Sequence, residues 1–388
     1  MNMRMMNFTD CVKLVGSSCK SFKGNKVYVS TGALDIDHIS ENDICFVDYD
    51  NKPSRANLTV LPGDVIFAKM QGTQKNLLID NERSEYVYST GFCAVRPIHG
   101  ILEAQYLNHY LASKSFLEQK DKLCSGATQK AITNSNLAKI LIPVTSIEEQ
   151  RNRINILDKV FDIIKNRKKQ LGQLEDLARS RFFEMFEETE NDKCRWPSKK
   201  LSELCTITSS KRIYQQEQSS DGIPFWRVSD LVNRIDLGQV TASLFIPEQK
   251  YEELKLAGFV PMPGDILVTS RGTLGKCYIV KKEDKFYFQD GMISWLKNIS
   301  DCITPLYLLY MFSMPSIKNQ ISGMQAGSTV SYLSIERLKR LNITVPDIET
   351  QEQFILFIEK INQTRLVIQK SLEKTKLLFD SLLQKYFG

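Results

Sequence analysis

The most regular hydrophobic pattern occurs in two long stretches, one in the middle of the chain and one at its end. In the first, apolar residues recur mainly at steps of three, four or seven, at Ile147, Ile154, Leu157, Phe161, Ile164, Leu171, Ala178, Phe182 and Met185. In the second, the seam alternates more strictly between steps of three and four, at Phe354, Ile358, Ile361, Arg365, Ile368, Leu372, Thr375, Phe379, Leu382 and Tyr386. A period of about 3.5 residues sustained this long is typical of a coiled coil. About 40 residues at roughly 1.5 Å each predict a helix on the order of 60 Å.

A single helix of this kind leaves its apolar seam exposed, whereas two in one chain can cover each other. We therefore expect the two helices to pair as an antiparallel coiled coil. The alternative is that each helix serves mainly as a docking site for another protein. Polar residues interrupt both seams, at Lys168, Glu175, Arg365 and Thr375. We expect these residues to constrain the register of the pair or to contact a partner.

The segments before the two helices have a mixed α/β pattern. Short apolar runs bounded by turn residues predict strands at 26–29, 65–68, 266–268 and 277–280. Helical spacing predicts helices at 103–123, 304–314 and 317–321. The chain is therefore expected to be α+β, with a first domain over 1–145, its helix over 146–190, a second domain over 191–346 and its helix over 347–388. The charged segment 187–197 is expected to form the hinge between the two copies.

An internal repeat supports this division. The run Leu61–Ile66 resembles Met262–Leu267, and Gly126-Ala127-Thr128 matches Gly327-Ser328-Thr329 at an offset of 327 − 126 = 201 residues. A proline followed seven positions later by a glutamine opens each long helix, at Pro143 and Gln150 and at Pro346 and Gln353. This period is too long for a solenoid, whose repeats span about 20–50 residues. It predicts two whole domains of one kind, and therefore two similar sites held at a fixed separation.

Composition restricts the class of protein but does not identify it. The net charge of +6 in 388 residues permits a polyanionic partner without requiring one. No apolar run approaches the roughly 18 residues of a membrane span, and residues 1–11 lack the features of a signal peptide. The nine cysteines include no C-x-x-C pair, which favours free thiols in a reducing cytoplasm. We therefore expect a cytoplasmic protein with no membrane association.

Motifs for catalysis are absent from the sequence. The run Arg271–Cys277 resembles a phosphate-binding loop, but it has two residues between its glycines where that loop needs four. There is no G-x-G-x-x-G fingerprint, and no Asn/Asp-Pro-Pro-aromatic tetrapeptide of an amino-methyltransferase. The three histidines have no metal or triad spacing and all lie in the first copy. The duplicated acid, Asp64 and Asp265, follows Pro-Gly and is interpreted as turn chemistry. The chain is thus expected to have no catalytic residue, metal or cofactor of its own.

Two duplicated loops carry the side chains that suit DNA recognition. The first comprises Lys69–Lys75 in one copy and Ser270–Lys276 in the other, and both combine glycine with basic, amide and hydroxyl groups. Arg271 could bind guanine O6 and N7, and Gln71 could bind adenine N6 and N7. The alternative is a solvated β-hairpin with ordinary surface residues.

The second duplicated loop, Ser125–Lys130 and Ala326–Ser331, is small and rich in hydroxyl groups. It could place backbone N–H groups on a phosphate, or it could simply precede a helix capped by Thr133 or Ser334. A basic cluster at 165–169 is either a solvated helix face or a further DNA contact. The candidate DNA-binding residues are Lys69, Gln71, Thr73, Lys75, Gln129, Lys130, Arg227, Ser270, Arg271, Thr273, Lys276, Ser328 and Thr329.

Taken together, these motifs resemble the specificity subunits of type I restriction–modification systems. The resemblance rests on the run Pro263–Lys276, the Gly-Ser/Ala-Thr loop, the proline and glutamine that open each long helix, and the tandem order, and it covers essentially the whole chain. It implies a non-catalytic protein with two target recognition domains, each binding one half of a bipartite site in double-stranded DNA. The paired helices would set the spacing with pseudo-twofold symmetry.

The resemblance also implies partners. Two modification subunits would bind S-adenosylmethionine and methylate adenine, and a complete complex would add ATP-dependent restriction subunits. The first copy lacks the Ser-Arg dipeptide that the run Pro263–Lys276 contains at Ser270 and Arg271, so the two half-sites are expected to differ. Two other interpretations remain open from the residues: a coiled-coil adaptor whose α/β domains bind proteins, and a nuclease hidden in one half.

Overall fold

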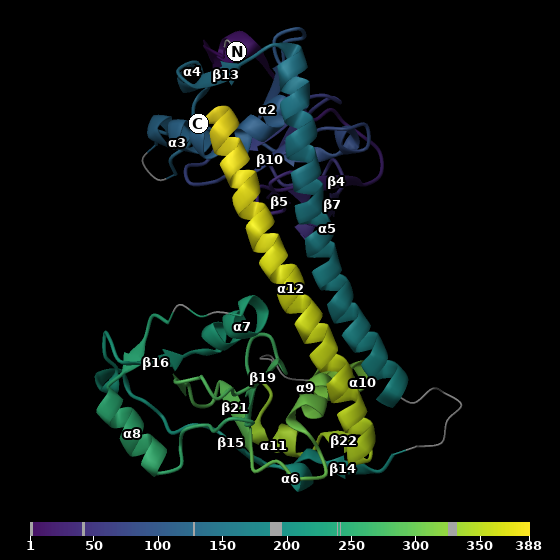
Figure 1. Ribbon diagram of the computed structural model, residues 1–388, viewed down its shortest axis with the longest axis vertical. Coiled ribbons are helices and arrows are strands. Elements are labelled where there is room, and N and C mark those ends of the chain that lie inside the picture. Colours follow the sequence, from purple (N-terminus) through teal and green to yellow (C-terminus); the bar gives the residue numbers. More distant parts are fainter. Residues whose placement is uncertain are drawn as a thin grey trace. The chain divides into compact units, whose positions relative to one another are not determined.

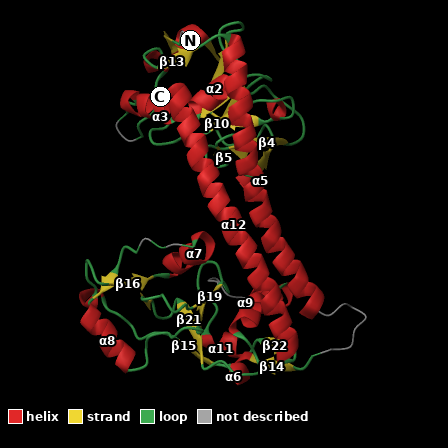
Figure 2. Ribbon diagram, viewed as in Figure 1, coloured by secondary structure: helices red, strands yellow, loops and turns green. Residues whose placement is uncertain are grey.

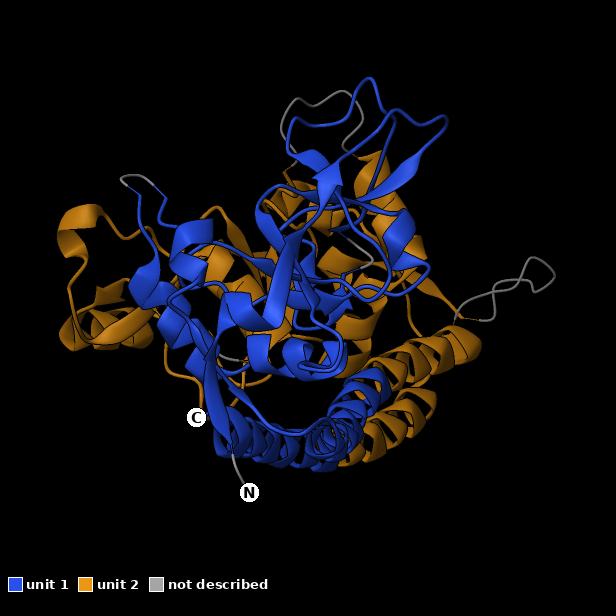
Figure 3. Cartoon of the chain, turned by 90° about the horizontal axis from the view of Figure 1, so that it is seen from above, with its two compact units in different colours: residues 1–170, 367–388 blue, residues 171–366 orange. Residues whose placement is uncertain are grey.

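The computed structural model describes residues 3–40, 43–126, 129–186, 196–238, 240, 242–324 and 332–388. The chain forms two compact units, residues 1–170 with 367–388 and residues 171–366 (Figure 3). Two 40-residue helices are labelled in Figure 1, α5 (Ile147–Phe186) and α12 (Ile348–Phe387), and each contributes to both units (Figure 3). They begin within one residue of the predicted starts. Residues 187–195, which cover most of the expected hinge, lie outside the described part of the chain.

Unit 1 contains a four-stranded sheet in the order β10-β9-β12-β2 and a five-stranded sheet in the order β3-β8-β11-β4-β7. Its strands are β1 (Arg4–Asn7), β2 (Val12–Val15), β3 (Ser17–Ser18), β4 (Lys26–Val29), β5 (Leu34–Asp35), β6 (His38–Ile39), β7 (Cys45–Val47), β8 (Ala56–Thr59), β9 (Val65–Ala68), β10 (Asn76–Leu78), β11 (Val87–Ser89), β12 (Phe92–Pro97) and β13 (Leu141–Val144). Its other helical segments are α1 (Phe8–Cys11), η2 (Arg83–Glu85), α2 (Ala104–Leu111), α3 (Lys114–Leu123) and α4 (Asn134–Leu137). The strands expected at 26–29 and 65–68 are confirmed.

Unit 2 repeats the four-stranded sheet in the corresponding order, β19-β18-β21-β15, and adds a three-stranded sheet, β17-β16-β20. Its strands are β14 (Ser198–Lys200), β15 (Thr206–Thr208), β16 (Ile223–Trp226), β17 (Phe245–Ile246), β18 (Ile266–Thr269), β19 (Cys277–Ile279), β20 (Tyr287–Phe288), β21 (Ile293–Lys297) and β22 (Asn342–Thr344). Its other helical segments are α6 (Leu201–Leu204), η3 (Gln215–Glu217), α7 (Val228–Leu237), α8 (Glu248–Leu256), α9 (Pro305–Ser313), α10 (Pro315–Gly323) and α11 (Ile335–Lys339). Short strands, long loops and helices alternate in both units, so the expected α+β class is confirmed (Figure 2).

The single helix predicted over 103–123 is wrong, because the chain forms two helices there. Helix α2 ends at Leu111, and Ser113 begins α3 by accepting the backbone N–H of Phe116 with its hydroxyl (3.2 Å). The break turns Phe116 into a buried cluster with Phe8, Phe67 and Tyr110. Apolar spacing continues across Ser113, so it gave no sign of a break that depends on a local cap and on distant aromatic residues.

The long helices pair within each unit as predicted. In unit 1, Phe161 of α5 contacts Phe379 of α12, with ring centroids 5.7 Å apart. In unit 2, Phe182 of α5 contacts Phe354 of α12 at 5.1 Å. The contacts pair increasing residue numbers along α5 with decreasing residue numbers along α12, so the two helices are antiparallel. Glu175 and Arg365, two of the polar residues in the seams, lie 3.9 Å apart as an ion pair.

The buried seam shifts by one residue at the end of each helix. The sequence pattern placed Met185 and Leu382 in the seam, but the buried residues are their neighbours Phe186 and Leu383. Phe387 is buried as well. An α-helix has 3.6 residues per turn, so a 3.5-residue pattern drifts around a straight helix. Phe387 packs on Tyr106 at 5.0 Å, which anchors the last turn of α12 to the domain in unit 1.

Polar side chains also join the globular part of unit 1 to the long helices. His109 of α2 is buried, and its Nε2 lies 2.7 Å from Oδ1 of Asp158 on α5. A guanidinium nitrogen of Arg153 lies 3.3 Å from the carbonyl oxygen of Tyr386, and the guanidinium covers the ring of that tyrosine. His109 is therefore a structural helix residue, as its spacing in the sequence indicated.

The 201-residue offset identifies a pair of buried glutamines at the starts of the long helices. Gln150 accepts the N–H of Glu103 and donates to the carbonyls of Ile101 and Thr145. The residue that makes these contacts in unit 2 is Gln351, 201 positions later, which bonds to Cys302, Thr304 and Pro346. The correspondence of Gln150 with Gln353 is therefore wrong, because Gln353 is exposed. The seven-residue spacing after Pro346 selected Gln353, whereas the buried glutamine is Gln351, two positions earlier.

Replacing Gln351 by alanine is expected to lower the free energy of unfolding of unit 2 by about 2–3 kcal/mol, because buried backbone groups would lose their partners. Gln353→Ala is the matched control and should change it by less than about 0.5 kcal/mol. All three tryptophans, Trp196, Trp226 and Trp295, lie in unit 2, so tryptophan fluorescence during urea denaturation reports on this unit. Equal effects of the two substitutions would contradict the assignment.

Candidate nucleic-acid interface

The duplicated Pro-Gly-Asp sequence forms a turn before the central strand of each four-stranded sheet. In unit 1, the Asp64 carboxylate accepts the N–H of Leu61 (2.9 Å) and is paired with Arg96 (2.6 Å). In unit 2, Asp265 accepts the N–H of Met262 (2.7 Å) and the indole N–H of Trp295 (2.9 Å). Burial raises the pKa of Asp265, while these hydrogen bonds act in the opposite direction. The interpretation as turn chemistry is confirmed.

The first candidate loop is the tip of a β-hairpin in both units. Strands β9 and β10 are antiparallel neighbours and enclose Lys69–Lys75, while β18 and β19 enclose Ser270–Lys276 in the same way. In both hairpins the last residue of the first strand donates its backbone N–H across the tip. Ala68 donates to the carbonyl of Lys75 and Thr269 to that of Lys276, each at 2.9 Å. The sequence offered a β-hairpin as the alternative interpretation, and the structure shows that the loop is indeed the tip of a hairpin at the end of a buried sheet.

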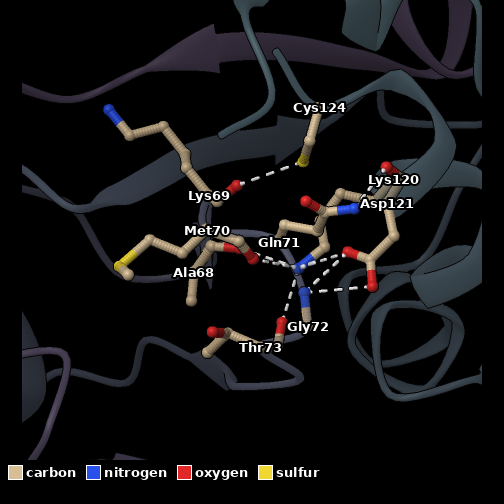
Figure 4. A network of polar contacts seen from close by, with 9 residues as sticks. All are labelled: Ala68, Lys69, Met70, Gln71, Gly72, Thr73, Lys120, Asp121 and Cys124. Carbon is tan, nitrogen blue, oxygen red and sulfur yellow. Dashed lines mark hydrogen bonds and ion pairs between the residues drawn. The ribbon is translucent and has the colours of Figure 1, made fainter. Parts of the chain in front are cut away.

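In unit 1 the tip is held by α3, through a network shown in Figure 4. The Lys120 ammonium is fully buried and donates to the carbonyls of Ala68 (3.4 Å), Met70 (2.8 Å) and Thr73 (2.5 Å). The neighbouring Asp121 carboxylate accepts the N–H of Gly72 (3.0 Å). Burial lowers the pKa of Lys120, and the Asp121 charge opposes that effect. Neither residue is among those predicted from the sequence. The one available signal was the four-residue spacing of Lys120 from buried Phe116, which places a lysine on the inner face of the helix.

The two candidate loops of unit 1, predicted separately, lie together. Gln71 donates its backbone N–H to the carbonyl of Lys130 (3.0 Å), and Ile132 donates to that of Lys69 (3.0 Å). Gln71, Gln129 and Lys130 are exposed, whereas Thr73 is half-buried. The half-buried Lys75 donates its ammonium to the carbonyl of Thr31 (2.8 Å), and Lys69 is also half-buried.

The helices after the second loop have the caps that the sequence offered as the alternative interpretation. The hydroxyl of Thr133 accepts the N–H of Asn136, and that of Ser334 accepts the N–H of Arg337. The candidate residues Ser328 and Thr329 lie outside the described residues, as do Ala127 and Thr128. Their contribution to a phosphate site stays a prediction.

The hairpin of unit 2 presents a different set of groups. Arg271 is exposed, and its guanidinium lies 5.3 Å from the centre of the Tyr332 ring. Thr273 is exposed too. Ser270 is buried and shares a 2.7 Å hydrogen bond with the hydroxyl of Ser294, so it positions the hairpin and presents no group to a partner. Lys276 is paired with Asp236 of α7 at 2.6 Å.

Arg227 lies directly before α7, the helix whose Asp236 forms the ion pair with Lys276. Its side chain is exposed and donates to the hydroxyl of Ser243 (2.9 Å), while its backbone N–H bonds to Asp230 (2.9 Å). The exposed candidates therefore form one group in unit 1 (Gln71, Gln129 and Lys130), and in unit 2 they comprise Arg271 and Thr273 on the hairpin and Arg227 beside α7. The described residues contain no cluster of three or more His, Cys, Asp or Glu that could hold a metal ion, and no described helix is long and apolar enough to cross a membrane.

Comparisons with known proteins agree with this duplicated architecture. Residues 10–176 and 194–376 each match the type I restriction modification DNA specificity domain. The chain is 24% identical over 268 residues to a Haemophilus influenzae protein named as a type I restriction enzyme specificity subunit, S.HindORF215P. The match covers 67% of this chain and 64% of that relative, so the chain spans less than two thirds of the relative's length. It is 25% identical over 318 residues to the MjaIX specificity subunit of Methanocaldococcus jannaschii, covering 76% of this chain and 70% of the relative.

Solved structures share the fold. The S subunit of a type I restriction–modification system from M. genitalium superposes with a TM-score of 0.54 at 16% identity, covering 100% of this chain and 96% of that one. A chain from a study of complex assembly in a type I R-M system gives a TM-score of 0.56 at 20% identity, covering 99% and 97%. Both specificity-domain matches fall on the duplicated halves described above. The chain therefore belongs to the type I restriction–modification DNA specificity family, with two specificity domains in tandem.

Proposed function

We propose that this chain is the DNA-recognition subunit of a type I restriction–modification complex, and that each of its two specificity domains recognises one half of a split target in double-stranded DNA. The observation that carries the proposal is the duplicated hairpin, which lies at the same place in both specificity domains and has different exposed polar residues in each copy. Two related recognition surfaces with different side chains suit a target with two different halves.

The chemistry of the exposed residues supports DNA as the ligand. Arg271 has a guanidinium fork that fits guanine, and the amide of Gln71 fits adenine. Gln71 donates one amide N–H to the carbonyl of Asp121 (3.3 Å), which orients the amide and leaves its oxygen and second N–H for a base. Lys130 and Arg227 are exposed cations that suit phosphate contacts. Binding should therefore weaken as salt concentration rises, because phosphate contacts release condensed counterions.

The long helices are the proposed docking surface for two modification subunits. Despite their pairing, these helices carry exposed apolar residues, namely Ile156, Ile163, Leu177, Phe183, Ile348, Leu356, Leu366, Val367, Leu377 and Leu378. These side chains give both helices apolar surface that a partner protein could cover. S-adenosylmethionine would be bound by these partners, and ATP by restriction subunits where present. The chain itself would be non-catalytic, without cofactor, and would act in the cytoplasm.

A methylation assay tests this proposal. The purified chain mixed with its modification subunits and S-adenosylmethionine is expected to methylate adenine within one split sequence in a pool of random duplexes. Neither component alone should do so. Methylation by the chain without its partners would contradict a non-catalytic role, and metal-dependent DNA cleavage by the chain alone would indicate a nuclease. Modification that does not depend on the chain would contradict a recognition role.

A further inference from the structure

The hairpin tip of unit 1 is fixed by a charged group that the rest of the domain buries. The Lys120 side chain is 1% exposed, yet its only charged neighbour within 4 Å among the described residues is Asp121 at 3.7 Å. Burying an ammonium group is costly unless hydrogen bonds compensate for the lost water. Here three backbone carbonyls compensate, and all belong to one short segment, Ala68–Thr73. The carbonyls of the tip therefore offset the cost of burying the ammonium group, and the ammonium group in turn holds the tip in shape.

The carbonyls come from both sides of the exposed residue Gln71. Met70 precedes it and Thr73 follows it, so the ammonium fixes the backbone on either side of the side chain that faces outward. Asp121 adds a bond to the N–H of Gly72, whose φ of 71° lies in the left-handed region that glycine adopts without strain. The carbonyl of Asp121 also accepts the Gln71 amide. Two successive residues of α3 thus hold the tip and the orientation of its exposed amide.

The second hairpin is held in another way. The counterpart of Lys120 at an offset of 201 is Ile321, a buried apolar residue of α10. A Cβ added at Gly275 would lie 3.1 Å from Cδ1 of Ile321, so this side chain packs directly against the turn. The hydroxyl of Thr269 donates to the carbonyl of Thr273 and accepts the N–H of Lys276 (3.0 Å). The hairpin of unit 2 is therefore held by its own hydrogen bonds, by the Ser270–Ser294 and Lys276–Asp236 contacts and by apolar packing, and Ile321 takes the place of the buried lysine.

We propose that Lys120, with Asp121, is a positioning residue that determines the base preference of the first specificity domain alone, by holding the tip Met70–Thr73 in one conformation. The inference rests on the proposed function, because it assumes that this hairpin contacts one half of a DNA target. Its physical basis is preorganisation: a fixed tip loses less conformational entropy on binding and offers one arrangement of Gln71 to the bases.

Two measurements on the full chain test the inference, with Lys120→Met as the variant. In hydrogen exchange, the amides of residues 70–73 should exchange about tenfold faster or more in the variant, because the carbonyls lose their shared partner. The amides of residues 271–275 should be unchanged. In selection from randomised duplexes by the chain with its modification subunits, discrimination should fall about tenfold at one half-site and stay intact at the other. The salt dependence of binding should not change, because Lys120 is too deeply buried to contact a phosphate.

Lys122→Met is the matched control, since Lys122 lies two residues away on α3 and is exposed. It should leave hydrogen exchange of the tip and both half-site preferences unchanged. If Lys120→Met fails to fold, Asp121→Ala removes the bond to Gly72 from a half-buried position and should give the same half-site effect at smaller size. Unchanged exchange at the tip, or equal loss at both half-sites, would overturn the positioning role. Failure of the unmodified chain to select any split sequence would instead overturn the proposed function.

Discussion

Replacing Phe182 by alanine is expected to lower the free energy of unfolding of unit 2 by about 3–5 kcal/mol. Phe182 is fully buried in α5, where four aromatic rings surround it. The ring centroids of Phe186, Tyr307, Phe354 and Tyr310 lie 4.8, 5.3, 5.1 and 5.8 Å away. Because these rings come from α5, α9 and α12, the cavity would loosen three helices at once, and neighbouring rings are too constrained to fill it.

The adjacent residue offers a matched control for this substitution. Phe183 is 46% exposed, so Phe183→Ala removes the same side chain from a position where little buried contact is lost. Its effect is expected to stay below about 1 kcal/mol. Tryptophan fluorescence during urea denaturation measures both variants, since every tryptophan lies in unit 2. Similar destabilisation by the two substitutions would contradict the observed orientation of α5.

Exchanging residues 1–145 for the first domain of another specificity subunit is expected to replace one half of the DNA target completely and to leave the other half unchanged. The physical reason is that the exposed residues of the two hairpins belong to separate domains with their own sheets and their own supports. Mapping of methylated adenines in cells that carry the chimaera and the modification subunits would reveal the new target. A change in both halves, with the spacing retained, would contradict independent recognition.

The junction with the long helices decides whether such a chimaera folds. Gln150 and Arg153 of α5 bond to residues 101–106 of the first domain, and Asp158 bonds to His109. The donor domain therefore needs a histidine and a tyrosine at the positions of His109 and Tyr106. As a control, a chimaera that also takes the donor's residues 146–158 should bind the same target if the junction is structural only.

Elements governed by nearby residues could be predicted well. The two long helices follow from their hydrophobic period. The hairpin of unit 2 follows from the strands predicted at 266–268 and 277–280, on both sides of a glycine-containing loop. The caps at Thr133 and Ser334 follow from short side chains placed before a helix. In each case the interacting groups lie close along the chain, so the sequence contains both partners in one window.

The errors share a physical cause, which is dependence on distant partners. The break at Ser113 has a local cap, but it serves the packing of Phe116 on the distant residues Phe8 and Phe67. Gln351 and not Gln353 is buried because its amide faces the carbonyl of Cys302, 49 residues earlier. Ser270 looked like a candidate ligand, but it is buried against Ser294 of the neighbouring strand.

The sequence by itself determined the family, the duplication with its 201-residue offset, the two long helices and the duplicated loops that form the tips of the hairpins. The tertiary structure decided which polar groups of those hairpins are free and what fixes their shape. Lys120 illustrates the difference, since its ammonium meets carbonyls 47 to 52 residues away. The spacing from Phe116 places this lysine on the inner face of α3, but only the folded arrangement of α3 over the hairpin shows which carbonyls the ammonium binds.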